Sequence, residues 1–527
     1  MSGSFAPSQT TRKPGVTATS GGVVAAQHAL AAQAGADILA QGGDAVDAAV
    51  AVSFVIGVLE PWMSGPLGGG AMMLWREGEG AKALHYGMRS SAALDPSYYP
   101  LSGHGKAGDL FPWEHLVDDR NIIGGSSVAV PGTVDGLAKA HGRYGTLPWK
   151  ELLAPAIAHA KLGLHVDYYA ALIIASSARE LAQDPDAAAL FLDDGQWPKG
   201  SGWTALADQR LDQSRHADTL DHLANAGPRD LYEGDIAAAL VRDVTDKGGF
   251  LTAQDLAGYS AAWQEALHIP FRNGALWAVP ELSAGPTLAD AMARWQTSYA
   301  PDQAQTPAAH LARAQGLYDA YDARLTQMGD HENPKAPGCT THFSIVDRHG
   351  NMVAMTQTLL SIFGSRAVSP STGMLLNNGI MWFDPEQGKP NSLGPDKGCL
   401  MNVCPIVGQA GPRRFALGAS GGRKIMPAVA QISGQLIEQG ATMQDAIEAP
   451  RLDVSGGDLV VLDERLRGPV SDAVASVFPV AHAQRLPFPF AFACPAGVMR
   501  EGVVNSGTTE TFSPWGDGIA ETCKAAR

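Results

Sequence analysis

Gly338-Cys-Thr-Thr-His-Phe-Ser-Ile-Val-Asp347, followed by the alternating run Met352-Val-Ala-Met-Thr-Gln-Thr358, is the stretch that decides the fold. Its pattern predicts strands, and the first of them begins with a threonine. A threonine with a free α-amino group is a complete catalyst, because its hydroxyl attacks while its own amine acts as the base. Since the chain before Thr340 is far longer than a signal peptide, that amine exists only if the protein cuts its own Cys339–Thr340 bond. Taken alone, the stretch also fits an ordinary half-buried strand.

Composition limits the classes of partner. The chain has 527 residues, of which 45% are hydrophobic, so it can bury a large core, and we interpret it as one compound domain. Its 38 Lys and Arg face 53 Asp and Glu, which gives a net charge of −15. That charge repels phosphate backbones and anionic membranes, so neither nucleic acid nor a membrane is expected as a partner.

Targeting and metal signals are weak. The first twenty residues are polar, and no apolar run of about eighteen residues predicts a membrane helix, so we expect a cytoplasmic protein. The fifteen histidines form no HxH or HExxH motif, and His342 and His349 lack carboxylates at ligand spacing, so no metal and no cofactor is expected. The cysteines are odd in number and lack CxxC spacing, which favours neither disulfides nor zinc: Cys339, Cys399, Cys404, Cys494 and Cys523.

The first part of the chain predicts helices that lead into a strand. Residues 21–58 have the pattern of a helix, a break at Gly42-Gly43, and a second helix that Asp44 caps at its N-terminus. A glycine-rich turn over 65–70 then leads into a strand at 71–75, and no Lys-Ser/Thr follows it to suggest a phosphate-binding loop.

The rest of the chain changes character at Thr340. Residues 168–328 are mostly helical in pattern, with an extended segment at 270–280. A segment rich in proline and charge, 329–338, predicts an exposed loop that cleavage releases. After Thr340 strands return, and Gly418-Ala-Ser-Gly-Gly422 opens an apolar helix over 425–439.

These motifs, in this order, resemble the γ-glutamyltranspeptidase family, whose members carry Thr-Thr-His-aromatic-Ser directly after their autocleavage point. The resemblance runs from the helix at 43–48 to the tail at 507–514. It implies an α/β (α+β) fold, the four-layer αββα sandwich of N-terminal-nucleophile hydrolases. It also implies a large fragment, 1–339, and a small fragment, 340–527, that stay together as one unit, either alone or in a dimer of such units.

The resemblance also implies roles for single residues. Thr340 corresponds to the nucleophile, and Thr358 to a second threonine whose hydroxyl orients it. Gly421 and Gly422 correspond to the pair whose N–H groups form the oxyanion hole. A glycine pair that opens a helix suits that role, because its unpaired N–H donors can point at developing negative charge. The alternative is a plain helix-opening turn.

The substrate's carboxylate has its own expected partners. Arg89 falls at the arginine that grips this carboxylate in the family, and a guanidinium fork binds both oxygens at once. The alternative is a solvated surface arginine. Met401 and Asn402 lie where the transpeptidases carry two serines, and only Asn402 can donate a hydrogen bond there.

Departures from the family are the most discriminating feature. Leu360, Gly379 and Trp382 stand where the transpeptidases place polar or acidic groups around the substrate's α-ammonium. An ammonium left without an acceptor there would cost several kcal/mol. Asp384 supplies an acceptor only if the alignment is displaced by two residues. The segment from Asp384 to Cys399 is also shorter than in transpeptidases with an aromatic lid, which favours water as the acceptor.

Three functions follow as hypotheses. The first is a self-processing amidohydrolase of a small amide that bears a carboxylate, similar to the oxamate amidohydrolase branch of the family. The second is a γ-glutamyltransferase or glutathione hydrolase, or a cephalosporin-type acylase. The third is an unprocessed binding protein, which the presence of Thr340, Thr358 and the glycine pair disfavours. The departures favour the first.

Overall fold

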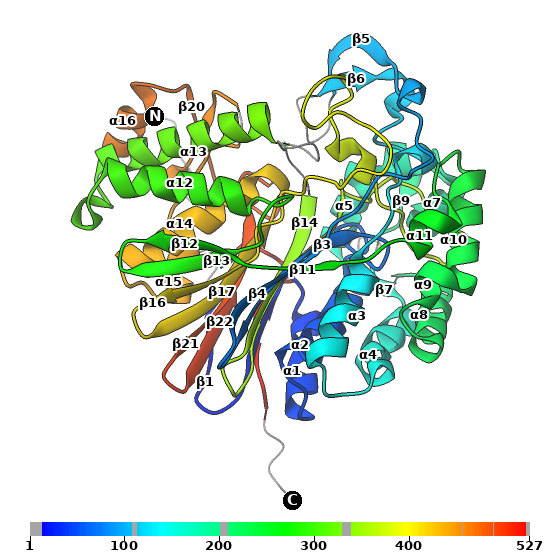
Figure 1. Ribbon diagram of the computed structural model, residues 1–527, viewed down its shortest axis with the longest axis horizontal. Helices are drawn as coiled ribbons and strands as arrows, with labels where there is room; N and C mark the ends of the chain where they lie inside the picture. The colour runs from blue at the N-terminus through cyan, green and yellow to red at the C-terminus, as the bar shows by residue number, and fades with distance from the viewer. Residues whose placement is uncertain are drawn as a thin grey trace, which may run out of the picture.

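The computed structural model describes residues 13–107, 113–200, 209–328, 339–455, 457–488 and 490–522. Two seven-stranded antiparallel sheets lie face to face, and helices cover the outer face of each (Figure 1). This confirms the four-layer αββα sandwich that the sequence predicts.

The first sheet contains the strand that begins at the expected nucleophile. Its strands, in spatial order, are β11 (Ala262–Gln264), β4 (Gly80–Tyr86), β3 (Gly69–Arg76), β15 (Met352–Leu360), β14 (Cys339–Val346), β2 (Val23–Ala26) and β23 (Asp517–Ala520). The long strands β14 and β15 lie near its centre, with strands from before Thr340 on both sides.

The second sheet is built in the same interleaved way. Its strands, in spatial order, are β1 (Val16–Ala18), β22 (Val504–Thr509), β21 (Cys494–Glu501), β17 (Arg413–Ser420), β16 (Ile406–Ala410), β13 (Gly274–Ala278) and β12 (Leu267–Phe271). Each sheet therefore takes strands from both sides of the Cys339–Thr340 bond.

Helices from the first part of the chain cover the first sheet, and later helices cover the second (Figure 1). The first group is α1 (Ala29–Ala40), α2 (Ala45–Leu59), α3 (Thr133–Tyr144), α4 (Trp149–Leu162), α5 (Tyr168–Ser176), α6 (Ala178–Leu181), α7 (Pro185–Phe191), α8 (Ser214–Ala226), α9 (Asp230–Glu233), α10 (Asp235–Asp246) and α11 (Ala253–Ala257). The second group is α12 (Gly285–Ser298), α13 (Pro307–Gln327), α14 (Ile425–Glu438), α15 (Met443–Glu448) and α16 (Pro469–Ala475).

Short two- and three-stranded ribbons join these layers. They are β5 (Leu101–Lys106) with β6 (Glu114–Leu116), β7 (Leu164–His165) with β10 (Arg210–Leu211), β8 (Leu192–Asp193) with β9 (Trp197–Pro198), and β18 (Leu452–Asp453) with β19 (Val460–Asp463) and β20 (Val480–Ala483).

Three hydrophobic cores match the three interfaces between the four layers. One joins the first sheet to its helices, one joins the second sheet to α12–α16, and the third fills the space between the sheets. The third core includes Met73 of β3, Ala354 of β15, Ala416 of β17 and Val498 of β21. Burial on both faces explains why these strands alternate less clearly than half-exposed ones.

Several local predictions are confirmed and one is wrong. Asp44 caps α2, and its side chain accepts hydrogen bonds from the N–H groups of Val46 and Asp47. The strand expected after the glycine turn is β3, and the helix expected at 425–439 is α14. The helix expected from Gly21 is wrong, because residues 23–26 form β2 and α1 begins only at Ala29.

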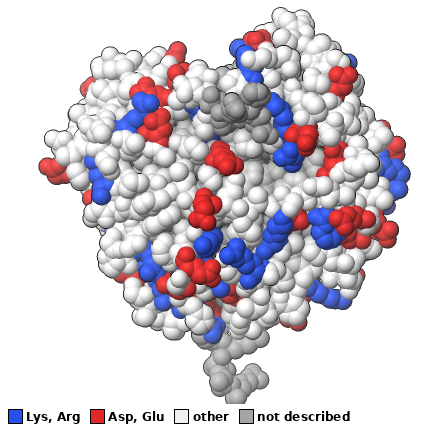
Figure 2. All heavy atoms as spheres, viewed as in Figure 1, with Lys and Arg blue, Asp and Glu red and all other residues white. Residues whose placement is uncertain are grey.

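No helix among the described residues is long and apolar enough to cross a membrane. On the face shown in Figure 2, acidic and basic side chains are interspersed and separated by broad uncharged areas.

Candidate active site

The expected nucleophile lies at an irregular point of β14. The strand pairs with β15 so that Thr341 lies opposite Gln357 and Cys339 opposite Leu360, with a register shift between them. On its other edge β14 pairs with β2 only from Phe343 onward. The first residues of β14 therefore have a regular partner on one side only.

Thr340 is 1% exposed, and its hydroxyl has no hydrogen-bond partner among the described residues. A buried hydroxyl without a partner is unusual and marks a candidate functional group. His342, two residues along, is neutral, because burial lowers its pKa to about 3. Its ring nitrogens lie 2.8 Å from Thr356 Oγ1 and 2.9 Å from Ser344 Oγ, so the histidine is a structural group and not a base.

Thr358 lies beside Thr340 on the neighbouring strand. Thr358 is two residues beyond Thr356, and Thr340 is two residues before His342, which contacts Thr356. Since side chains two residues apart on a strand point to the same face, Thr340 and Thr358 lie on the face that His342 and Thr356 share. The Thr358 hydroxyl accepts a hydrogen bond of 2.8 Å from the N–H of Leu360. That bond holds the hydroxyl in place, which is compatible with the orienting role that the resemblance implies.

The glycine pair lies where β17 ends and α14 begins. Gly421 and Gly422 have φ of +123° and +62°, values that favour glycine. The short 3-10 helix η6 (Gly422–Lys424) packs against β14. A Cβ at Gly421 would lie 2.9 Å from Ala493 Cα, so the chain passes closely there. The pair is thus brought next to the nucleophile strand, as an oxyanion hole requires.

Arg89 follows β4, which lies on the β15 side of β14 in the first sheet. Its backbone bridges Val130 and Gly398, and its side chain is 42% exposed. Its Nη2 donates to Asp396 Oδ1 at 2.9 Å and to the Asp396 carbonyl at 2.7 Å. Because the Asp396 side chain is 71% exposed, this pair is weak, and a substrate carboxylate can replace it.

We expect Arg89→Lys to lower kcat/KM while processing continues. The loss of transition-state stabilisation should be about 1–3 kcal/mol, the cost of a lost charged hydrogen bond. Steady-state kinetics on the best substrate measure this. Arg467→Lys is the matched control, because Arg467 also pairs with a surface carboxylate, Glu464 at 2.7 Å, but lies elsewhere. Unchanged kinetics for Arg89→Lys would remove Arg89 from the site.

Asn402 is buried and held from behind by an arginine. The Nη2 atom of Arg324, on α13, donates to Asn402 Oδ1 at 3.1 Å and to the Met401 carbonyl at 3.0 Å. Since a guanidinium can only donate, the amide oxygen must face it, which leaves Asn402 Nδ2 turned away. That nitrogen has no partner among the described residues. Asn402 thus has a free donor, as its expected role requires.

The wall beside Asn402 is apolar. Leu360, Trp382 and Met401 share the core between the sheets, and Gly379 packs against Met88. Trp382 is fully buried.

Asp384 already has partners of its own. Its carboxylate lies 3.2 Å from Lys389 Nζ and accepts a hydrogen bond of 3.0 Å from the N–H of Glu386. An ammonium brought to this wall would therefore compete with Lys389 for that carboxylate.

Sequence reasoning missed two polar residues near β14. Gln27 follows β2, and its Oε1 accepts a hydrogen bond from His342 N at 3.4 Å. Glu60 follows α2, and its Oε2 accepts one from Thr341 Oγ1 at 3.4 Å. A carboxyl directly after the apolar second half of α2, where only Ser53 is polar, was the available signal for Glu60. Arg324 was missed too, although buried residues recur with helical spacing before it on α13.

The cysteines and candidate metal ligands are described for only part of the chain. Cys399, Cys404 and Cys494 take part in no disulfide among the described residues. No cluster of three or more His, Cys, Asp and Glu side chains able to hold a metal occurs within the described ranges. Residues 329–338, Cys523 and the side chain of Cys339 lie outside the described residues.

Comparison with known proteins identifies the family. Residues 31–339 and 319–476 match the family described as Gamma-glutamyltranspeptidase. An acylase ACY 1 proenzyme from Pseudomonas sp. strain V22 is 32% identical over 86% of this chain and 86% of its own length. A glutathione hydrolase proenzyme from Pseudomonas aeruginosa is 30% identical over 82% of each.

The solved structures agree. The crystal structure of a cephalosporin acylase from Bacillus halodurans superposes with a TM-score of 0.79, at 26% identity, over 99% of both chains. With this fold, the buried threonine near the start of β14 and the glycine pair beside it, the chain belongs to the γ-glutamyltranspeptidase family of N-terminal-nucleophile hydrolases.

Proposed function

We propose that this protein is a self-processing acylase, which hydrolyses an amide whose acyl part ends in a carboxylate and carries no α-ammonium group. The observation that carries the proposal is the wall formed by Leu360, Gly379 and Trp382, which offers no side-chain acceptor. An ammonium buried there without a partner would cost several kcal/mol, whereas a simple methylene chain packs against such a wall.

The relatives support self-processing and the acylase alternative. Relatives at 32% and 30% identity are named as proenzymes, which fits cleavage of the Cys339–Thr340 bond. They are an acylase and a glutathione hydrolase, so they favour the acylase alternative over a specific oxamate amidohydrolase. Oxamate remains a useful short test substrate.

The proposed mechanism uses groups that the fold brings together. After cleavage, the α-amine of Thr340 takes the proton from its own hydroxyl, and Thr340 Oγ1 attacks the amide carbonyl. The N–H groups of Gly421 and Gly422 stabilise the negative oxygen of the tetrahedral intermediate. The α-ammonium returns this proton to the amide nitrogen, so the intermediate expels a neutral amine and leaves an acyl-enzyme ester. Water, deprotonated by the same amine, then hydrolyses that ester and frees the Thr340 hydroxyl. The pKa of an α-amine is about 7.7–8, so part of it is neutral near pH 7 and can act as the base.

Substrate orientation follows from two donors. Arg89, once released from Asp396, binds the distal carboxylate, and the free Nδ2 of Asn402 donates to the same group. Arg324 stays behind Asn402 and fixes the direction in which that amide points.

A substrate panel tests the proposal. Processed enzyme should cleave glutaryl-p-nitroanilide with a higher kcat/KM than γ-glutamyl-p-nitroanilide, since only the second compound must bury an ammonium. Oxamate and glutathione complete the panel. If γ-glutamyl compounds are the best substrates, the glutathione hydrolase alternative replaces our proposal.

Leu360→Asn should move this preference toward the γ-glutamyl compound, by about tenfold or more in the ratio of kcat/KM values. Leu360 has φ of +89°, a region that asparagine tolerates better than leucine, so the change relieves strain while it adds an acceptor. Leu393→Asn is the control, because Leu393 is buried in the same core outside the proposed wall. An equal shift in both variants, or none in Leu360→Asn, would contradict the proposed wall.

A further inference from the structure

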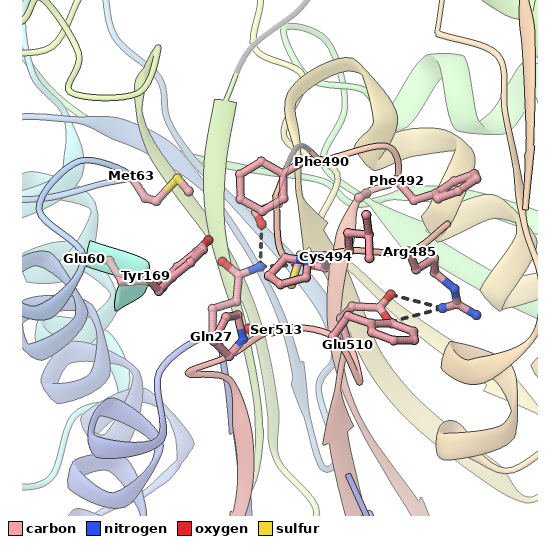
Figure 3. A pocket seen from close by; sticks show the side chains of 16 residues that line it. Gln27, Glu60, Met63, Tyr169, Arg485, Phe490, Phe492, Cys494, Glu510 and Ser513 are labelled. Atoms are coloured by element: carbon pink, nitrogen blue, oxygen red, sulfur yellow. Dashed lines mark hydrogen bonds and ion pairs between the residues drawn. The ribbon is translucent and has the colours of Figure 1, made fainter. Parts of the chain in front are cut away.

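A small pocket that opens to solvent lies beside the start of β14, with a cavity volume of about 40 Å³ behind a wide mouth. Figure 3 shows Glu60, Met63 and Tyr169 on one side of this strand, and Phe490 and Phe492 on the other. The pocket is separate from the wall around Trp382, because none of its lining residues belongs to that wall.

The pocket starts at the edge of β14 that β2 leaves unpaired. Gln27 covers that edge, donating from Nε2 to Ser420 Oγ at 2.5 Å and to the Cys494 carbonyl at 2.7 Å. Ser420 directly precedes the glycine pair, and Glu60 contacts Thr341 next to the nucleophile. The pocket therefore borders both the nucleophile strand and the expected oxyanion hole.

Geometry separates the two halves of the substrate. In the tetrahedral intermediate the acyl chain, the oxyanion and the departing nitrogen occupy different corners of one carbon. Arg89 follows β4, and Trp382 lies in the 3-10 helix η5 (Gly379–Trp382), which contacts β15, so both lie on the β15 side of β14. The glycine pair takes the oxygen. The part of the pocket next to Gln27, Ser420 and Cys494 lies at the opposite, β2 edge, which is the direction left for the nitrogen.

We propose that this pocket is the subsite for the leaving amine, and that it selects neutral amines with a small aromatic or apolar body over anionic ones such as a peptide. The inference rests on the acylase function proposed above and names the second half of its substrate.

The lining suits an apolar group. Nine of its sixteen residues are apolar or aromatic: Met63, Tyr169, Leu486, Pro487, Phe490, Phe492, Ala493, Phe512 and Pro514. Phe512 and Leu486 are 36% and 47% exposed, so they form the mouth. Edge and face contacts with such rings stabilise an aromatic amine beyond simple burial.

Among the residues that the structure describes, the cations near the pocket are bound to other partners. Arg485 donates to Glu510 and Asp463 and to the carbonyls of Ile447, Glu448 and Ala449. Lys424 Nζ donates to the carbonyls of Phe490 and Ala491, at 2.9 and 2.8 Å. A carboxylate on the leaving group would thus enter the pocket without a free cation, which is costly.

Glu60 adds a second reason. Burial raises the pKa of Glu60 to about 8. Glu60 is therefore mainly protonated near pH 7 and becomes an anion as the pH rises through about 8. The other titratable groups in the described lining of the pocket are the phenol of Tyr169, the thiol of Cys494 and the Arg485–Glu510 pair. Of these, Cys494 interacts electrostatically with Glu60, and also with Lys13. Burial raises the pKa of Cys494 to about 12, so this thiol stays neutral over the same range.

A matched pair of anilides tests the subsite. Glutaryl-4-carbamoylanilide and glutaryl-4-carboxyanilide share the acyl group and the ring, and differ in the charge of the leaving amine. We expect kcat/KM to favour the neutral amine by about tenfold near pH 7, and more strongly above pH 8, where charged Glu60 repels the carboxylate. The catalytic α-amine titrates equally for both substrates, so it cancels in their ratio.

Three variants separate this role from a merely structural one. Leu486→Ala and Phe512→Ala, both at the exposed mouth, should raise KM for the neutral anilide several-fold and leave that for oxamate unchanged. Glu60→Gln should remove the rise of the ratio above pH 8. Val503→Ala is the control, because it is 68% exposed and lies in the turn at the far end of β21 and β22.

The outcomes are distinguishable. A preference for the neutral amine that the mouth variants weaken supports the subsite. Cleavage of both anilides at equal rates, with no effect of the variants, overturns the subsite and leaves the acylase function standing. Failure to cleave any amide of a simple carboxylate overturns both proposals.

Discussion

Thr340→Ala is expected to remain one chain of 55.1 kDa and to lose at least about 10³-fold in kcat. Without the hydroxyl, neither the Cys339–Thr340 bond nor the substrate's amide can be attacked. Denaturing electrophoresis should show two bands for the wild type and one for the variant. The fold should survive, because Thr340 Oγ1 makes no hydrogen bond within the described residues that alanine would remove.

Thr340→Ser is the matched control, because it keeps the hydroxyl and loses only a methyl group. It should still process, and it should retain measurable activity. A wild-type preparation that stays a single chain and is fully active would sink the whole N-terminal-nucleophile mechanism.

Gly421→Ala should lower kcat by about 10²-fold, since one displaced oxyanion donor costs that much or more. Alanine is strained at φ of +123°, and its Cβ would lie 2.9 Å from Ala493 Cα, so the backbone N–H must move. Single-turnover kinetics on purified, processed enzyme would isolate the acylation step from any effect on processing.

Gly468→Ala separates this effect from glycine strain alone. Gly468 has φ of +78°, and a Cβ there meets nothing within 4 Å. This variant should lose a little stability, of order 1 kcal/mol, and keep its kcat. If both glycine variants lose kcat equally, Gly421 does not belong to the oxyanion hole.

The sequence predicted those elements that local rules determine. Asp44 starts α2 because its side chain caps the first turn, and the alternating runs after Thr340 form β14 and β15. It failed at Val23–Ala26, where a short strand leads into α1 without a glycine or proline to separate them. A four-residue apolar run fits either element, and only its pairing with β14 decides the outcome.

Sites formed by distant segments were harder to predict. The family resemblance brought Thr340, Gly421 and Arg89 together, but their roles stay predictions until variants are measured. Nothing in the local sequence shows that Arg324 orients Asn402, or that Glu60 lies beside Thr341. The first pair is 78 residues apart in the sequence and the second is 281 residues apart. Such contacts depend on strand order and helix packing, which composition and periodicity do not encode.

Because both sheets interleave strands from the two fragments, cleavage changes the molecularity of folding. Val16–Ala18 pairs with residues 505–507, and β14 lies between β15 and β2, so both sheets need strands from both fragments. The intact precursor forms these ladders in a first-order reaction. Once the Cys339–Thr340 bond is cut, the same ladders become the joint between two separate chains, and refolding becomes second order. The finished enzyme would then be a heterodimer whose apparent melting temperature depends on its own concentration. Its native strand pairing would last only as long as the two fragments stay together.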